Sequence, residues 1–131
     1  MFTAARFIVI AAAAVAFAGV AHAQDSANRK EIKRADLGGT SMEVILSTAE
    51  YKPGDTVVRH IHHGEEAFYV LEGSTVEFPD GKQITLSTGS GNINLRDIPH
   101  AGFKVVGGTP LKLLTVHVVD KGAPLYDAPP K

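Results

Sequence analysis

Hydrophobic and polar residues alternate in short runs along most of this chain, and no stretch keeps a 3.6-residue apolar period for three helical turns. A period of two is typical of a strand that buries one face. Segments rich in glycine, proline and aspartate, such as Lys52-Pro53-Gly54-Asp55, separate the runs. The segments that we expect to form strands are residues 42–49, 56–62, 67–71, 75–78, 83–86, 92–98, 100–106 and 111–119. Short strands at this spacing predict an all-β sandwich or barrel.

Residues 1–23 have the pattern of a secretory signal peptide. Arg6 precedes an uncharged apolar run, and Ala21-His22-Ala23 provides small residues at the expected cleavage positions. The apolar run is shorter than the roughly 20 residues that a membrane-spanning helix needs. We therefore expect cleavage after Ala23, a periplasmic or secreted protein, and no stable membrane insertion once the signal peptide is removed.

The rest of the chain is interpreted as one domain with two flanking segments. Residues 24–41 form an N-terminal segment that starts with polar residues, and residues 42–119 form the β-domain. Residues 120–131 form an extended tail that contains three prolines. A chain of this length suits a single small core.

Charge and cysteine content exclude several classes of function. Lysines and arginines number 13 against 14 aspartates and glutamates, which gives a formal net charge of -1. A chain without a cationic surplus cannot neutralise a row of phosphates, so we expect no nucleic-acid partner. The lack of cysteine excludes disulfides, a thiol nucleophile and thiolate metal sites. Any metal must therefore bind to histidine and carboxylate side chains.

The strongest chemical signal is a group of histidines and carboxylates between residues 60 and 66. In a strand, His60 and His62 point to the same side, so both imidazoles can bind one ion. A turn then returns the chain antiparallel and brings Glu66 beside this pair. Glu65 is the alternative carboxylate, but Glu66 shares its parity with the expected core residue Phe68. Two histidines and one carboxylate favour Fe(II) or Mn(II), with Zn or Ni as further options.

These residues fit a sequence motif, and through it the chain resembles a small, single-domain, exported member of the cupin superfamily. The first cupin motif has the form G-x5-H-x-H-x3–4-E-x6-G. It is matched without a gap by Gly54, His60, His62, Glu66 and Gly73. The resemblance covers about residues 42–119 and implies a jelly-roll β-barrel.

The second cupin motif, G-x5-P-x-G-x2-H-x3-N, is only partly present. With Gly89 as its first residue, its histidine falls on His100. Its proline, second glycine and asparagine fall on Leu95, Asp97 and Lys104. The resemblance implies that one divalent metal ion is bound by His60, His62, Glu66 and His100.

Four further side chains are candidates for a place near the ion without binding it directly: His63, Glu65, Lys104 and His117. His63 lies in the turn with the opposite parity to the ligands, and solvent exposure is its alternative. Lys104 shares the parity of His100 and either meets an anionic substrate or extends past the rim into solvent. His117 either faces the barrel interior, where it orients a ligand or water, or is a core histidine bonded to backbone.

The fold class does not by itself name a reaction. The first hypothesis is a metal-dependent enzyme of the oxygenase, isomerase or lyase type that acts on a small chelating substrate. The alternative is a non-catalytic module that binds a metal or a metabolite, which the short chain favours. No residue stands out as the catalytic acid or base. We also expect a homodimer, because a short chain gains buried apolar surface by pairing.

Overall fold

The computed structural model describes residues 27–131. The predicted signal peptide and its cleavage position lie outside the described residues. Within residues 27–131, no helix is long and apolar enough to cross a membrane. The strands of this part are β1 (Arg29–Asp36), β2 (Met42–Tyr51), β3 (Thr56–Val57), β4 (Gly64–Glu72), β5 (Ser74–Glu77), β6 (Gln83–Leu86), β7 (Gly91–Asn94), β8 (Phe103–Val105) and β9 (Leu111–Asp120).

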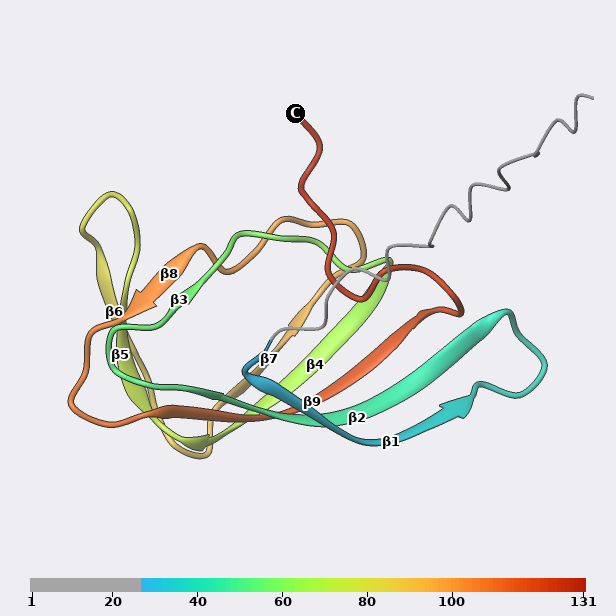
Figure 1. The fold of residues 1–131 in the computed structure, drawn as a ribbon, viewed down its shortest axis with the longest axis horizontal. Coiled ribbons are helices and arrows are strands. Elements are labelled where there is room, and N and C mark those ends of the chain that lie inside the picture. Colours follow the sequence, from blue (N-terminus) through green and yellow to red (C-terminus); the bar gives the residue numbers. More distant parts are fainter. Residues whose placement is uncertain (1–26) are drawn as a thin grey trace, which may run out of the picture.

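The strands form two antiparallel sheets (Figure 1). The five-stranded sheet has the order β1-β2-β9-β4-β7, and the four-stranded sheet has the order β3-β8-β5-β6. β9 lies between β2 and β4, so strands that are distant in the sequence pair in the centre of the larger sheet. This connectivity is that of a jelly roll, and the prediction of an all-β, barrel-like fold is confirmed.

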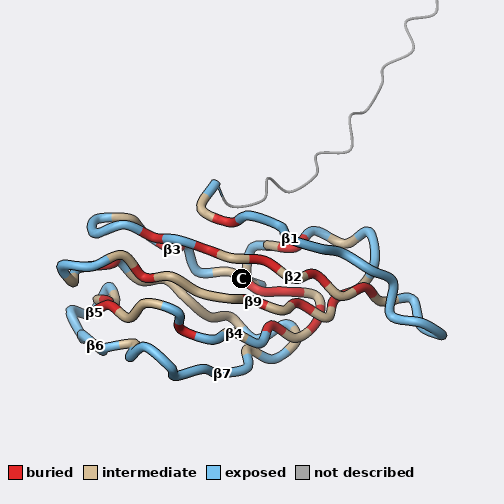
Figure 2. Tube along the Cα trace, turned by 90° about the horizontal axis from the view of Figure 1, so that it is seen from below, coloured by how far each residue is buried: buried red, intermediate tan, exposed pale blue. Residues whose placement is uncertain are grey.

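The main core lies between the two sheets. Alternate residues are buried along β2 and β9, and the buried positions concentrate on these strands in Figure 2. The cluster takes side chains from both sheets: Ala49, Tyr51, Val57, Val70, Val76, Val105 and Leu111. Since each sheet contributes apolar side chains to the same cluster, burial of this surface holds the sheets together.

The inward positions of β9 lead from this core to a second, smaller cluster. Leu111 belongs to the main core, whereas Val119 packs with Ile45 and Leu125. His117 has the same parity and is fully buried between the two clusters. The fold therefore leaves a polar layer inside the barrel between two apolar ones.

Three predicted segments form shorter strands than their alternation suggests. Residues 56–62 contain only β3, residues 92–98 contain part of β7, and residues 100–106 contain only β8. The last break has a clear cause, because Ala101 and Gly102 have φ angles of 59° and 78°. A strand does not tolerate two successive left-handed residues.

β1 has no counterpart among the predicted strands. Only its first residue, Arg29, is buried, so no hydrophobic alternation marks the strand in the sequence. β1 pairs along nearly its whole length with β2, with one register shift between Glu31 and Lys33. Part of the N-terminal segment 24–41 is thus an edge strand of the larger sheet.

The C-terminal tail packs against the barrel. Leu125 is buried, and Asp127 forms an isolated bridge with Ile61 through backbone hydrogen bonds of 3.0 and 3.1 Å. In Figure 1 the tail turns back from the end of β9 toward the segment that follows β3. Residues 125–127 therefore form one wall of the barrel interior at this end.

Candidate metal centre

The four predicted ligands come from three separate segments that the fold brings together. His60 and His62 follow β3, Glu66 lies near the start of β4, and His100 precedes β8. The backbones of His60 and His100 form an isolated bridge, with N–H···O distances of 3.1 and 3.0 Å. This bridge places the two histidines opposite each other although they are 40 residues apart in the sequence.

The side chains of this cluster are in close contact. The ring centroid of His60 lies 4.4 Å from the ring centroid of His100 and 4.7 Å from that of His62. Glu66 Oε2 lies 3.3 Å from His62 Nε2 and 3.4 Å from His100 Nε2. The structure therefore brings all four predicted ligands to one place, whereas metal binding by them stays a prediction.

The outer nitrogen of each of the three histidine rings is engaged by a backbone carbonyl. Nδ1–H of His60 donates to Val58 O at 2.7 Å, and that of His100 donates to Ile98 O at 3.0 Å. His62 Nδ1 bonds the carbonyl of Leu125 in the tail. With Nδ1 protonated, each ring turns an Nε2 lone pair inward, as in metal-binding histidines.

These inward lone pairs lack ordinary partners, which fits a metal ion. His60 Nε2 and His62 Nε2 lie only 3.2 Å apart, although neither bears a proton when Nδ1 donates. His100 Nε2 is buried without a hydrogen bond among the described residues. Buried acceptors that converge without donors are costly, and a cation between them removes this cost. The donor set of imidazoles and one carboxylate therefore fits a divalent ion.

His117 joins the cluster from the opposite side. Its Nε2 lies 3.4 Å from Glu66 Oε1, and it is the cross-strand neighbour of Glu66. Neither of its ring nitrogens has a hydrogen bond within the described part of the chain. Of the two sequence-based alternatives, the structure places His117 at the barrel interior rather than on a backbone partner. His62, Glu66 and His117 form a second group with atoms close enough to bind one ion.

Burial favours the neutral form of two imidazoles in this cluster, those of His60 and His117. Burial lowers the pKa of His60 to about 4 and also lowers the pKa of His117. Neutral histidine and ionised glutamate are the forms that bind metal ions.

Two residues of the site carry no signal in the sequence. Asn94 on β7 donates its Nδ2–H to Glu66 Oε2 at 2.8 Å and so orients the carboxylate. Tyr126 in the tail places its ring 4.8 Å from His60 and 5.2 Å from His62. Asn94 belongs to a predicted strand, but only the β4–β7 pairing makes it the neighbour of Glu66. Tyr126 lies in a proline-rich tail for which the sequence predicts no contact at all.

The other candidates lie outside the cluster. His63 has its ring nitrogens 3.0 Å from Asp97 Oδ1 and from Asp127 Oδ2, and these carboxylates raise its pKa. Glu65 has the opposite parity to Glu66 on β4 and turns to the outside of the sheet. Lys104 is exposed on β8, because the left-handed residues between it and His100 break the alternation on which its placement depended.

The chain belongs to the cupin family. The family model of the cupin domain matches residues 47–117, which is more than half of the chain. This match includes the first motif and His100. Comparison with curated proteins finds no match.

Solved structures of the same fold resemble this chain. The polyketide cyclase RemF from Streptomyces resistomycificus is 29% identical, with a TM-score of 0.51, over 65% of this chain and 60% of RemF. An uncharacterized protein with a double-stranded beta-helix domain from Klebsiella pneumoniae is 17% identical, with a TM-score of 0.53, over 84% of this chain and 92% of that chain. A DMSP lyase structure is 22% identical, with a TM-score of 0.48, over 63% of this chain and 40% of the lyase. This chain therefore spans less than two thirds of RemF and of the lyase.

The backbone accounts for the incomplete second motif. The second glycine of that motif falls on Asp97, whose φ angle of 57° lies in the left-handed region. Aspartate enters this region more readily than most residues. The N–H of Asp97 also donates to His62 O at 3.0 Å. The turn before His100 is thus formed without glycine.

Proposed function

We propose that this chain is an exported, metal-dependent cupin enzyme that acts on a small molecule able to chelate the ion through oxygen atoms. The observation that carries the proposal is the convergence of the Nε2 atoms of His60, His62 and His100 on Glu66, with each Nδ1 engaged by a backbone carbonyl. Three imidazoles and one carboxylate leave about two positions of an octahedral ion for a substrate. When bound, the ion supplies a Lewis acid or an oxygen-activating centre.

The residues around the cluster suit a substrate site. A cavity of about 110 Å³ lies against His60, Glu66 and His100. Its walls include the apolar side chains of Phe68 and Phe103. The phenol groups of Tyr51 and Tyr126 also line this cavity, and their hydroxyl oxygens are suited to hold or donate a proton. The likeness to RemF, a polyketide cyclase, supports an enzyme rather than a passive binding module.

The identity of the ion decides the type of reaction. A site with nitrogen and oxygen ligands and open positions favours Fe(II) or Mn(II), and it also accepts Zn or Ni. Iron would direct the assays to oxygen-consuming reactions, whereas manganese or zinc would direct them to isomerase or lyase reactions.

The protein is also proposed to form a homodimer through the outer face of the larger sheet. Cross-strand neighbours on this face form apolar rows, such as Ile93, Ala67, Val116 and Leu46 across four strands. Ile93 is 57% exposed, and Tyr69 on the same face is 49% exposed. A contiguous apolar face of this kind is typical of an interface, and a second copy of this chain would bury it.

Elemental analysis of the full-length expressed chain, purified without chelators, tests the proposal. We expect one divalent ion per chain, and loss of that ion in the double variant His60→Ala/His62→Ala. Mass spectrometry of the intact protein should give the mass of a chain that begins at Gln24. His63→Ala is the matched control and keeps the ion, because His63 faces two carboxylates outside the cluster. A wild-type chain without metal would refute the metal centre. A metal-loaded chain that binds small chelators without turnover would favour the non-catalytic module.

A further inference from the structure

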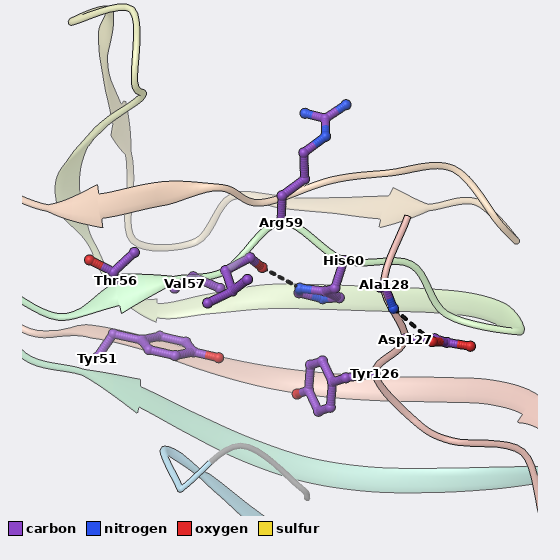
Figure 3. A pocket seen from close by; sticks show the side chains of 9 residues that line it. Tyr51, Thr56, Val57, Arg59, His60, Tyr126, Asp127 and Ala128 are labelled. Carbon is purple, nitrogen blue, oxygen red and sulfur yellow. Dashed lines mark hydrogen bonds between the residues drawn. The ribbon is translucent and has the colours of Figure 1, made fainter. Parts of the chain in front are cut away.

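A second, larger cavity adjoins the histidine cluster (Figure 3). Its volume is about 440 Å³, and it lies between the segment that follows β3 and the C-terminal tail. Four of its lining residues also line the small cavity beside Glu66: Tyr51, Val57, His60 and Tyr126. The two cavities are therefore separated by a single layer of side chains. A molecule in the outer cavity lies one side chain away from the candidate metal centre.

The charged side chains that line the outer cavity are engaged elsewhere or turned away. The carboxylate of Asp127 lies 3.0 Å from His63 Nε2 and accepts the N–H of Ala128 at 2.7 Å. Arg59 is exposed, and Figure 3 shows it extending away from the two tyrosines. A charged ligand in this cavity would lose its water without gaining a partner from either side chain. Neither of these two charged side chains therefore offers a partner to a charged ligand.

Apart from the hydroxyl group of Thr56, the remaining walls are aromatic and aliphatic. Tyr51 is 6% exposed, and Tyr126 packs edge-on against His60 with 4.8 Å between ring centroids. In Figure 3 the hydroxyl groups of Tyr51 and Tyr126 point toward one another across the cavity. Val57 and Val58 complete the apolar lining. The edges and faces of the tyrosine and histidine rings favour contact with a further aromatic ring. The volume of the outer cavity falls within the roughly 300–1,000 Å³ of small-molecule sites.

We propose that the outer cavity binds the ring of a small, uncharged aromatic compound, whose hydroxyl or carbonyl oxygen reaches between Tyr51 and Tyr126 toward the histidine cluster. The destination of that oxygen rests on the proposed function, whereas the ring site depends only on the cavity walls. Tyr126 determines the specificity, because it lines both cavities and its ring contacts His60 and His62. The tail thus supplies the residue that selects the substrate.

Calorimetric titration of the full chain with three related α-hydroxy ketones tests this inference. The probes are 2-hydroxy-1-phenylethanone, its cyclohexyl counterpart and its 4-carboxyphenyl counterpart. They share the chelating end and differ only in the ring. We expect the phenyl compound to bind at least about threefold more tightly than the cyclohexyl compound, and about tenfold more tightly than the charged compound.

Variants of Tyr126 test whether the preference for the phenyl compound arises in the outer cavity. Tyr126→Leu keeps apolar bulk and is expected to remove the preference for phenyl over cyclohexyl, whereas Tyr126→Phe restores it. Tyr69→Leu is the matched control, because Tyr69 lies on the outer face of β4, lines neither cavity, and leaves that face apolar when replaced by leucine. Metal content is measured on every variant and is expected to stay at the wild-type value.

The outcomes separate this inference from the proposed function. A chain that holds one metal ion but binds the three probes equally would overturn the aromatic site and leave the metal centre intact. A chain without metal that still prefers the phenyl compound would support the aromatic site and overturn the metal centre. Unchanged selectivity in Tyr126→Leu would show that the ring binds elsewhere and would overturn the assignment to this cavity.

Discussion

The candidate centre depends on how single side chains are oriented, and backbone atoms supply much of that orientation. His60, His62 and His100 each present Nε2 because a carbonyl oxygen engages Nδ1. Glu66 is oriented in the same way by the amide of Asn94. The motif residues of this chain therefore act only together with neighbours that the motif does not contain, which is common in metal sites.

Acidification is expected to destabilise the metal-free chain through His60. Its pKa is about 4 in the folded chain and 6.5 in the reference state, so the unfolded chain binds more protons between these values. The contribution of His60 to the free energy of unfolding is therefore complete above pH 6.5 and decreases as the pH drops toward about 4. Urea unfolding of His60→Gln across this range checks the effect and should give a flatter profile than wild type.

His63→Gln provides the opposite control for this pH dependence. The pKa of His63 is raised by Asp127 and Asp97, so its contribution is present at low pH and is lost as the pH rises through its folded pKa. Removing His63 should therefore steepen the loss of stability on acidification or leave it unchanged. If the stability of His60→Gln depended on pH in the same way as that of wild type, His60 would not be the cause of the pH dependence.

Gly64 is expected to tolerate no side chain. A Cβ atom built there would lie 2.0 Å from the carbonyl oxygen of Val118, and the φ angle of +156° disfavours other residues. Gly64→Ala should therefore lower the free energy of unfolding by about 3 kcal/mol or more. Gly38→Ala is the control, since nothing lies within 4 Å of its Cβ position. Denaturant unfolding of both variants measures the difference.

At the level of elements, the C-terminal tail is part of the site. Its backbone pairs with Ile61, its Leu125 packs on Ile45 and Val119, and the Leu125 carbonyl engages His62. Pairing of β4 with β9 and β7 then places His117 and Asn94 on either side of Glu66. The centre is therefore assembled by β4, β7, β9 and the C-terminal tail, which are far apart in the sequence.

Deletion of residues 124–131 is expected to weaken metal binding. The deletion removes the carbonyl that fixes the tautomer of His62, and loss of such a partner typically costs about tenfold or more in affinity. Titration of the metal-free chain with the ion found by elemental analysis measures this change. Deletion of residues 129–131 is the control and should leave affinity unchanged. Equal affinities in the two truncated chains would show that the tail does not support the centre.

At the scale of the whole molecule, one sheet has two apolar faces. The inner face of β9 lines the core and the site, while Leu114, Val116 and Val118 alternate with it on the outside. A small chain without cysteine has few other means of burying this outer surface. The proposed dimer and the barrel would thus depend on opposite faces of the same central strand.

Val116→Lys is expected to convert a dimer to a monomer. The charge would lie at the centre of the apolar rows, and burying it without a partner is costly. Light scattering at micromolar concentration reports the mass, and circular dichroism checks that the variant is folded. Val58→Lys is the control, because Val58 is 75% exposed and outside this sheet. A wild-type chain with the mass of a monomer would refute the dimer.

The sequence by itself determined the fold class and the ligand candidates from its first motif. Alternation identified most strands because one face of each is buried, and the spacing of His60, His62 and Glu66 placed them on one side of adjacent segments. The strands and the group His60, His62 and Glu66 are features of local periodicity and spacing, which a sequence carries directly. His100 was implied only by the resemblance to the second cupin motif, whose histidine falls on it when Gly89 is the first residue.

Only the tertiary structure decided which distant segments meet. β1 lacks alternation, Lys104 follows a break at Ala101, and Tyr126 lies in a tail without a pattern. Cross-strand pairing also brought His117 and Asn94 to Glu66. Such contacts depend on sheet order and on backbone hydrogen bonds between residues far apart in the chain, and a periodic pattern in one segment contains no information about its partner.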